Sequence, residues 1–75
     1  MKPYRNLSGD SGVTHYEIGS DFIAVRFRKG DKYLYNYRRP GRYEVEEMKR
    51  LAVAGQGLST FISQQVRERY VEKLD

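Results

Sequence analysis

The sequence predicts an α+β fold: a three-stranded antiparallel meander followed by two helices packed on one face of the sheet. Between residues 13 and 37, three short runs alternate with a period of two and are rich in aromatic and β-branched side chains. Turn-forming residues separate these runs. After residue 41 the apolar residues recur with the period of a helix instead, which places the helices after the sheet.

The chain of 75 residues is long enough for one hydrophobic core only. We expect residues 1–12, which are rich in turn formers, to form a flexible leader and residues 13–74 to form a single domain. No apolar run approaches the roughly 20 residues that a membrane-spanning helix needs, and the N-terminus lacks the pattern of a secretory signal. Cysteine is absent, so disulfides and thiolate metal sites are excluded. These features favour a cytoplasmic protein with no membrane partner.

The first two strands are expected over residues 13–18 and 22–28, joined by a two-residue turn at Ser20 and Asp21. Residues paired directly across such a hairpin point to the same side of the sheet. The predicted pairs are Ile18 with Ile23, Tyr16 with Val25, and Thr14 with Phe27. This pairing gives the hairpin one apolar face.

The third strand is expected over residues 32–37, after a three-residue loop whose Gly30 takes the left-handed position of a bulge. The predicted pairs are Phe27 with Asp31, Val25 with Tyr33, and Ile23 with Tyr35. The tyrosines of this strand then join the apolar face, and a shift of one residue would turn all of them outward. Inward tyrosines suit a core, because strands accept this residue readily; the alternative is a platform on which nucleic-acid bases stack.

Two helices are expected after residue 41. In the first, the apolar residues have helical spacing and the acidic residues precede the basic ones, as the helix dipole favours. Its apolar residues are Val45, Met48, Leu51 and Ala52. The second helix follows the glycine-bearing turn at residues 55–57 and carries its apolar stripe to the end of the chain. That stripe consists of Leu58, Phe61, Ile62, Val66, Tyr70 and Leu74.

The residue types needed for catalysis are scarce. His15 is the only histidine, and the predicted register places it opposite Arg26 without an orienting carboxylate in reach. No nucleophile–base pair and no metal cluster can be assembled, so we expect no enzyme, no catalytic residue, no metal and no cofactor. The turn at residues 55–57 either offers N–H groups to an anion or simply joins two helices; the lysine and the preceding strand of a phosphate-binding loop are missing.

Positive charge is concentrated in one stretch of the chain. The formal net charge is +4, yet residues 22–43 alone have a net charge of +6. Such a concentration favours an anionic partner, although a solvated basic face without a partner would have the same composition. Arginine predominates, and its guanidinium forks to phosphate oxygens and stacks on bases. The candidate nucleic-acid-binding residues are Arg26, Arg28, Lys32, Arg38, Arg39 and Arg42.

The segments 30–35 (Gly-Asp-Lys-Tyr-Leu-Tyr) and 66–70 (Val-Arg-Glu-Arg-Tyr) resemble motifs of the KTSC domain, a small bacterial domain also found at the C-terminus of some lysyl-tRNA synthetases. The similarity spans residues 11–70. The family motif corresponds to Tyr33, Tyr35, Val66, Arg67 and Tyr70. Ser63 stands where the family tends to have asparagine. The resemblance implies a bacterial protein and, through the synthetase association, a role in RNA binding.

Two functions from different classes follow. The first is a small module that binds RNA, single-stranded nucleic acid or another polyanion through the candidate bases. The second is a protein-interaction or homo-oligomerising module that uses the two free edges of a three-stranded sheet.

Overall fold

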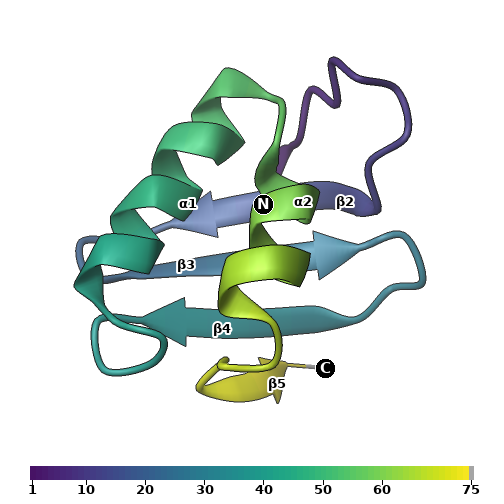
Figure 1. Ribbon diagram of the computed structural model, residues 1–75. Helices are drawn as coiled ribbons and strands as arrows, with labels where there is room; N and C mark the ends of the chain where they lie inside the picture. The colour runs from purple at the N-terminus through teal and green to yellow at the C-terminus, as the bar shows by residue number, and fades with distance from the viewer. Residues whose placement is uncertain (75) are drawn as a thin grey trace.

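The computed structural model describes residues 1–74 and shows a five-stranded antiparallel sheet in the order β1-β2-β3-β4-β5. Both helical segments lie on one face of the sheet (Figure 1). The elements are β1 (Lys2–Pro3), β2 (Val13–Ile18), β3 (Phe22–Phe27), β4 (Lys32–Asn36), α1 (Arg42–Ala54), α2 (Leu58–Phe61), the π-helical turn η1 (Ile62–Val66) and β5 (Glu72–Leu74). The predicted α+β class and central meander are confirmed, whereas the count of three strands is corrected to five.

The register of the meander agrees with the pattern of the sequence. The observed pairs include Ile18 with Ile23, Tyr16 with Val25, Val25 with Tyr33, and Ile23 with Tyr35. In the second hairpin, the Phe27 N–H donates to the Asp31 carbonyl at 2.8 Å, and Gly30 has the left-handed φ of 99° that the bulge requires. The turn chemistry therefore determines which side chains face the core.

One predicted pair is wrong. A bulge in β2 makes Val13, rather than Thr14, the partner of Phe27. The extra residue lets Val13 enter the core, where it is 1% exposed, while the Thr14 hydroxyl donates to the Arg26 carbonyl at 3.2 Å. The bulge thus buries the apolar side chain and gives the polar one a backbone acceptor.

The inward orientation of the tyrosines is confirmed. Tyr35 is 1% exposed, and Tyr33 and Tyr37 pack against the core from the same face of the sheet. Burial is the main cause that raises the pKa of the Tyr35 hydroxyl above its ordinary value of 10.0. The fully buried side chains around it come from both layers: Val13, Ile23, Val25, Val45, Met48, Leu58 and Val66.

The N-terminal segment, predicted to be a flexible leader over residues 1–12, is instead attached to the domain. Lys2 pairs with Tyr16 in β2, and the Tyr4 N–H donates to the Thr14 carbonyl at 2.8 Å. Tyr4 is 6% exposed, and its hydroxyl accepts a hydrogen bond from the Leu58 N–H at 3.3 Å. One buried aromatic ring anchors this segment, and a strand of two residues is too short to give a periodic pattern.

The second helix ends at Val66 rather than near residue 74. The Arg67 N–H bonds to the Ile62 carbonyl at 2.5 Å, which closes a π turn, and Arg67 then adopts a φ of 55° that stops the helix. The chain turns back and pairs as β5 with β4, where Leu74 lies opposite Lys32. Tyr70 still packs against Tyr33, from an irregular segment rather than from a helix.

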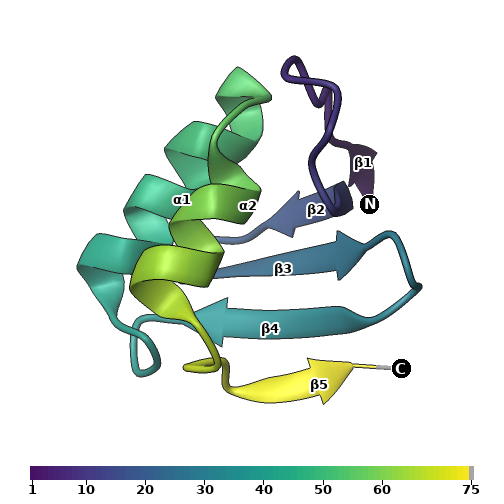
Figure 2. The same cartoon turned by 45° about the vertical axis from the view of Figure 1, so that its right-hand side comes forward.

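The edges of the sheet also differ from the prediction. The strands over residues 13–18 and 32–37 were expected to be free edges, but β1 and β5 pair with them. The actual edge strands have two and three residues, and short edge strands offer little backbone for pairing with another chain. Within residues 1–74, the face opposite the helices has no helix over it (Figure 2).

Candidate functional site

The structure places the six candidate bases in two groups rather than in one patch. The hairpin bases, Arg26, Arg28 and Lys32, lie where β3 turns into β4. The loop bases, Arg38, Arg39 and Arg42, lie in the connection from β4 into α1 and at the first residue of that helix. The two groups are separated by the length of β4. At the usual rise of a strand, this length is about 13 Å from the first to the last residue.

The hairpin bases present positive charge on the face opposite the helices. Arg26 and Lys32 are direct partners across β3 and β4, so their side chains project on the same side of the sheet. The Arg28 guanidinium donates to the Ser11 carbonyl at 3.0 Å and is held by the N-terminal segment. Asp31, the acid of this hairpin, forms its ion pair with Lys73 at 3.4 Å. The charge of Arg26 and Lys32 is therefore not cancelled by the carboxylate closest to them in sequence.

The loop bases are held by Asn36, a residue that the sequence analysis did not single out. Its Oδ1 accepts the backbone N–H groups of Arg38 at 2.9 Å and Arg39 at 3.1 Å. Its own N–H donates to the Arg39 carbonyl at 2.9 Å, and its carbonyl accepts the Gly41 N–H at 3.2 Å. Asparagine at the start of a loop that also contains Pro40 and Gly41 is a typical turn signal and could have indicated this role. The loop thus has a fixed backbone, while both arginine side chains are exposed.

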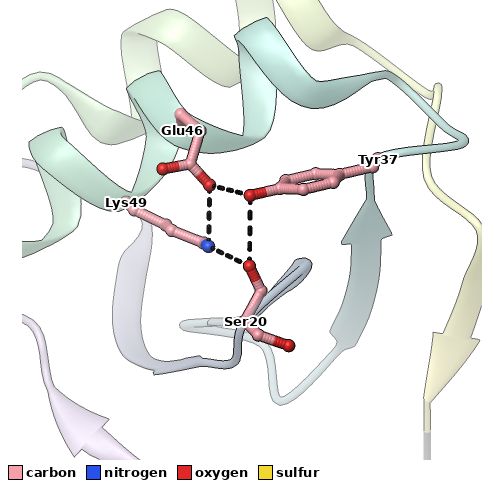
Figure 3. A network of polar contacts seen from close by, with 4 residues as sticks. All are labelled: Ser20, Tyr37, Glu46 and Lys49. Carbon is pink, nitrogen blue, oxygen red and sulfur yellow. Dashed lines mark hydrogen bonds and ion pairs between the residues drawn. The ribbon is translucent and has the colours of Figure 1, made fainter.

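A second set of polar contacts fixes the start of α1 (Figure 3). The Tyr37 hydroxyl lies 2.5 Å from Glu46 Oε2 and 3.1 Å from the Ser20 carbonyl, and Lys49 Nζ donates to the same two oxygens at 2.8 Å and 3.0 Å. The hydroxyl has one hydrogen, and the shorter contact gives it to the carboxylate. The Arg42 guanidinium lies 5.5 Å from the centre of the Tyr37 ring, a cation–π distance. The end of β4, the β2–β3 turn and α1 are therefore tied together beside a loop base.

The same network sets the protonation of its two acids. The hydrogen bonds from Lys49 and from Tyr37 lower the pKa of the Glu46 carboxyl below its ordinary value. The hydrogen bond to Glu46 raises the pKa of the Tyr37 hydroxyl. At neutral pH Glu46 is therefore a carboxylate and Tyr37 a neutral phenol.

Ion pairing divides the bases of residues 1–74 into two sets. Four ion pairs form within residues 1–74: Lys49 with Glu46, Arg50 with Glu47, Arg69 with Glu44, and Lys73 with Asp31. None of the six candidates takes part in these four pairs. Lys49, Arg50, Arg69 and Lys73 are thus neutralised by neighbouring carboxylates, whereas the hairpin and loop bases keep their charge for another partner. Four other bases, Lys2, Arg5, Lys29 and Arg67, also lie outside these pairs.

The residues that resemble the KTSC motif fall into two kinds of environment. Tyr70 packs against Tyr33 with ring centres 4.6 Å apart and meets Tyr35 edge-on at 6.4 Å. Val66 is fully buried. These side chains belong to the core, and Tyr35 is too deeply buried to stack on a base. Arg67, in contrast, is exposed.

Other candidate sites are occupied by contacts within the chain. His15 is half-buried beside β1, and its Nδ1 is buried without a hydrogen-bond partner in the described part of the chain. In the turn at residues 55–57, the Gly55 carbonyl accepts the Leu7 N–H at 2.7 Å, which attaches the N-terminal segment. Asp10 lines the small hollow beside this turn and would repel an anion. Within residues 1–74, no three side chains of histidine, aspartate or glutamate gather where they could hold a metal ion.

Comparison with known proteins gives no relative: no family model, no curated protein and no solved structure matches this chain. The likeness of residues 30–35 and 66–70 to the KTSC domain stays a prediction. No helix among residues 1–74 has the length and apolar character that crossing a bilayer requires. What the chain binds must be inferred from its own residues.

Proposed function

We propose that this chain is a small, non-enzymatic binding module for single-stranded nucleic acid, RNA in particular, and that it contacts the phosphates through the hairpin bases and the loop bases. The observation that supports this most is the difference in ion pairing. Every candidate base lies outside the four ion pairs of the described residues, so the positive charge concentrated in residues 22–43 is not neutralised by these pairs.

The geometry favours a flexible anionic polymer over a small anion. The hairpin and loop bases lie at opposite ends of β4, about 13 Å apart by strand rise, so a single phosphate does not reach both groups. A single strand can bend to follow them, and its phosphates supply a negative charge at every nucleotide. Self-association through the sheet edges has less support, since β1 and β5 pair with the two strands that were expected to be free.

A salt titration tests the proposal. A labelled single-stranded RNA is titrated with the protein by fluorescence anisotropy at several salt concentrations. If about four bases contact phosphates, the logarithm of the affinity falls with the logarithm of salt at a slope near −3. No binding at low salt, or a slope near zero, overturns the proposal.

The double variant Arg38→Ala/Arg39→Ala tests the loop bases. Loss of two phosphate contacts reduces the magnitude of the slope by about 1.4 and weakens binding to all sequences alike. The matched control is Lys2→Ala/Arg50→Ala, which lowers the net charge equally but removes one base from β1 and one that is paired with Glu47. Equal effects of the two double variants would indicate that net charge, rather than the loop, determines binding.

A further inference from the structure

Arg67 has a backbone conformation that suits glycine. Its φ is 55° and its ψ is −125°, close to the first central residue of a type II′ turn. The turn is closed by a hydrogen bond from the Arg69 N–H to the Val66 carbonyl at 3.1 Å. A residue with a Cβ rarely adopts these angles, whereas glycine does so readily. Arginine at this position is therefore strained.

The side chain of Arg67 does not offset this strain through contacts with the fold. It is exposed and takes no part in the side-chain hydrogen bonds or ion pairs of residues 1–74. The neighbouring Arg69 satisfies the end of the helical segment instead: its guanidinium donates to the Gln65 and Val66 carbonyls and lies 3.6 Å from Glu44. Strain without a local benefit is typical of residues that serve a binding function.

The turn lies opposite the loop bases. Arg67 directly precedes the residues that line, together with Arg39, a hollow of about 510 Å³; these residues are Glu68, Arg69, Tyr70 and Val71. The Val71 N–H donates to the Leu34 carbonyl at 2.7 Å, which fixes this segment to β4. Two fixed turns, one ordered by Asn36 and one closed by the Val66–Arg69 bond, thus meet at this hollow. Arg39 lines it from the first turn, and the unpaired Arg67 directly precedes the residues that line it from the second.

We infer that Arg67 is a further ligand-contacting residue, which binds a phosphate of the same single strand that contacts Arg38 and Arg39. This inference rests on the proposed function. Arg69 is not counted with it, because Glu44 and two carbonyls already engage its guanidinium. Glu68, which lines the hollow together with Arg39, disfavours an isolated small anion there. A polymer that the loop bases and the hairpin bases also contact is therefore the ligand that fits.

The variant Arg67→Gly tests two effects of the arginine separately, namely the backbone strain and the contact with a phosphate. Relief of the strain raises the melting temperature, by several degrees in a domain of this size. Loss of one phosphate contact reduces the magnitude of the salt slope by about 0.7. If the variant and the wild type bind equally at 1 M salt, the variant therefore binds about eightfold more weakly at 50 mM salt. A residue with a purely structural role would not change the slope.

Two further variants complete the experiment. Arg67→Lys keeps the charge and restores most of the slope, with no gain in melting temperature. Arg50→Ala removes one distant positive charge and is expected to leave the slope within error of the wild type. If the wild type binds RNA and Arg67→Gly binds it equally well, or if Arg50→Ala weakens it as much, the inference is wrong and the proposed function stands. If the wild type does not bind at low salt, both are overturned.

Discussion

At the scale of single residues, the polar network around Tyr37 determines how one end of the molecule responds to pH. Glu46 is ionised in this network, and the hydrogen bonds from Lys49 and Tyr37 hold its pKa below the ordinary 4.5. A group with a lowered pKa in the folded state stabilises the fold above its unfolded-state pKa and loses that contribution as the pH falls through its folded-state pKa. The stabilisation by this network is therefore present at neutral pH and disappears in acid, below pH 4.5.

The variant Glu46→Gln tests this directly. Glutamine keeps an oxygen for the Tyr37 hydroxyl but loses the charge that attracts Lys49. We expect the variant to be less stable than the wild type at pH 7 and to approach it as the pH falls below 4.5, as measured by urea unfolding across this range. Glu17→Gln, on the exposed part of β2, is the control and should follow the wild type at every pH. A stability difference independent of pH would contradict the role of the carboxylate charge.

At the scale of elements, the sequence predicts those that produce a repeated pattern and misses those that depend on one or two contacts. The meander was predictable because alternation over six residues and the turns at Ser20–Asp21 and Gly30 agree on one register. The strand β1 has two residues and depends on the buried ring of Tyr4, which leaves no period to recognise. The helical spacing of Tyr70 predicts a longer second helix than the structure has, because Tyr70 reaches Tyr33 from an irregular segment.

The attachment of the N-terminal segment gives a prediction at this scale. Tyr4→Ala removes a buried aromatic ring, and we expect a loss of about 3 kcal/mol in the free energy of unfolding. Tyr4→Phe keeps the ring but removes the acceptor for the Leu58 N–H, and should cost about 1 kcal/mol. Leu7→Ala, at a side chain that is 57% exposed, should change stability little.

Hydrogen exchange provides the second measurement for these variants. In Tyr4→Phe, which should stay folded, the Tyr4 and Leu58 amides should exchange faster while those in the centre of β3 remain protected. A Tyr4→Ala variant as stable as the wild type would show that the segment is a flexible leader after all.

At the scale of the whole molecule, the candidate site was predictable in composition but not in arrangement. The excess of bases in residues 22–43 identifies the candidate residues. A net charge summed over a stretch of sequence does not show, however, that β4 separates these residues into two groups. Nor does it show every base that is neutralised: the pairs of Lys49 and Arg50 follow from helical spacing, but the pair of Arg69 with Glu44 depends on the fold. The sequence indicates Arg67 only through its resemblance to the KTSC motif, because the backbone angles of a residue cannot be predicted from its type alone.

The separation of the two groups predicts how affinity depends on the length of the ligand. A distance of about 13 Å corresponds to about four nucleotides at the 3.4 Å spacing of a stacked strand. Oligonucleotides shorter than this contact one group at a time, whereas longer ones contact both. When a longer strand is already bound to one group, its contact with the second group is an intramolecular step. We therefore expect the affinity to rise sharply over a narrow range of lengths above about four nucleotides. In Arg38→Ala/Arg39→Ala the rise should be much smaller, because only Arg42 of the loop bases is left, whereas Lys2→Ala/Arg50→Ala should keep it. A smooth increase of affinity with length in the wild type would contradict this. It would mean that the two groups attract the strand independently, by general electrostatics, and do not form one binding surface.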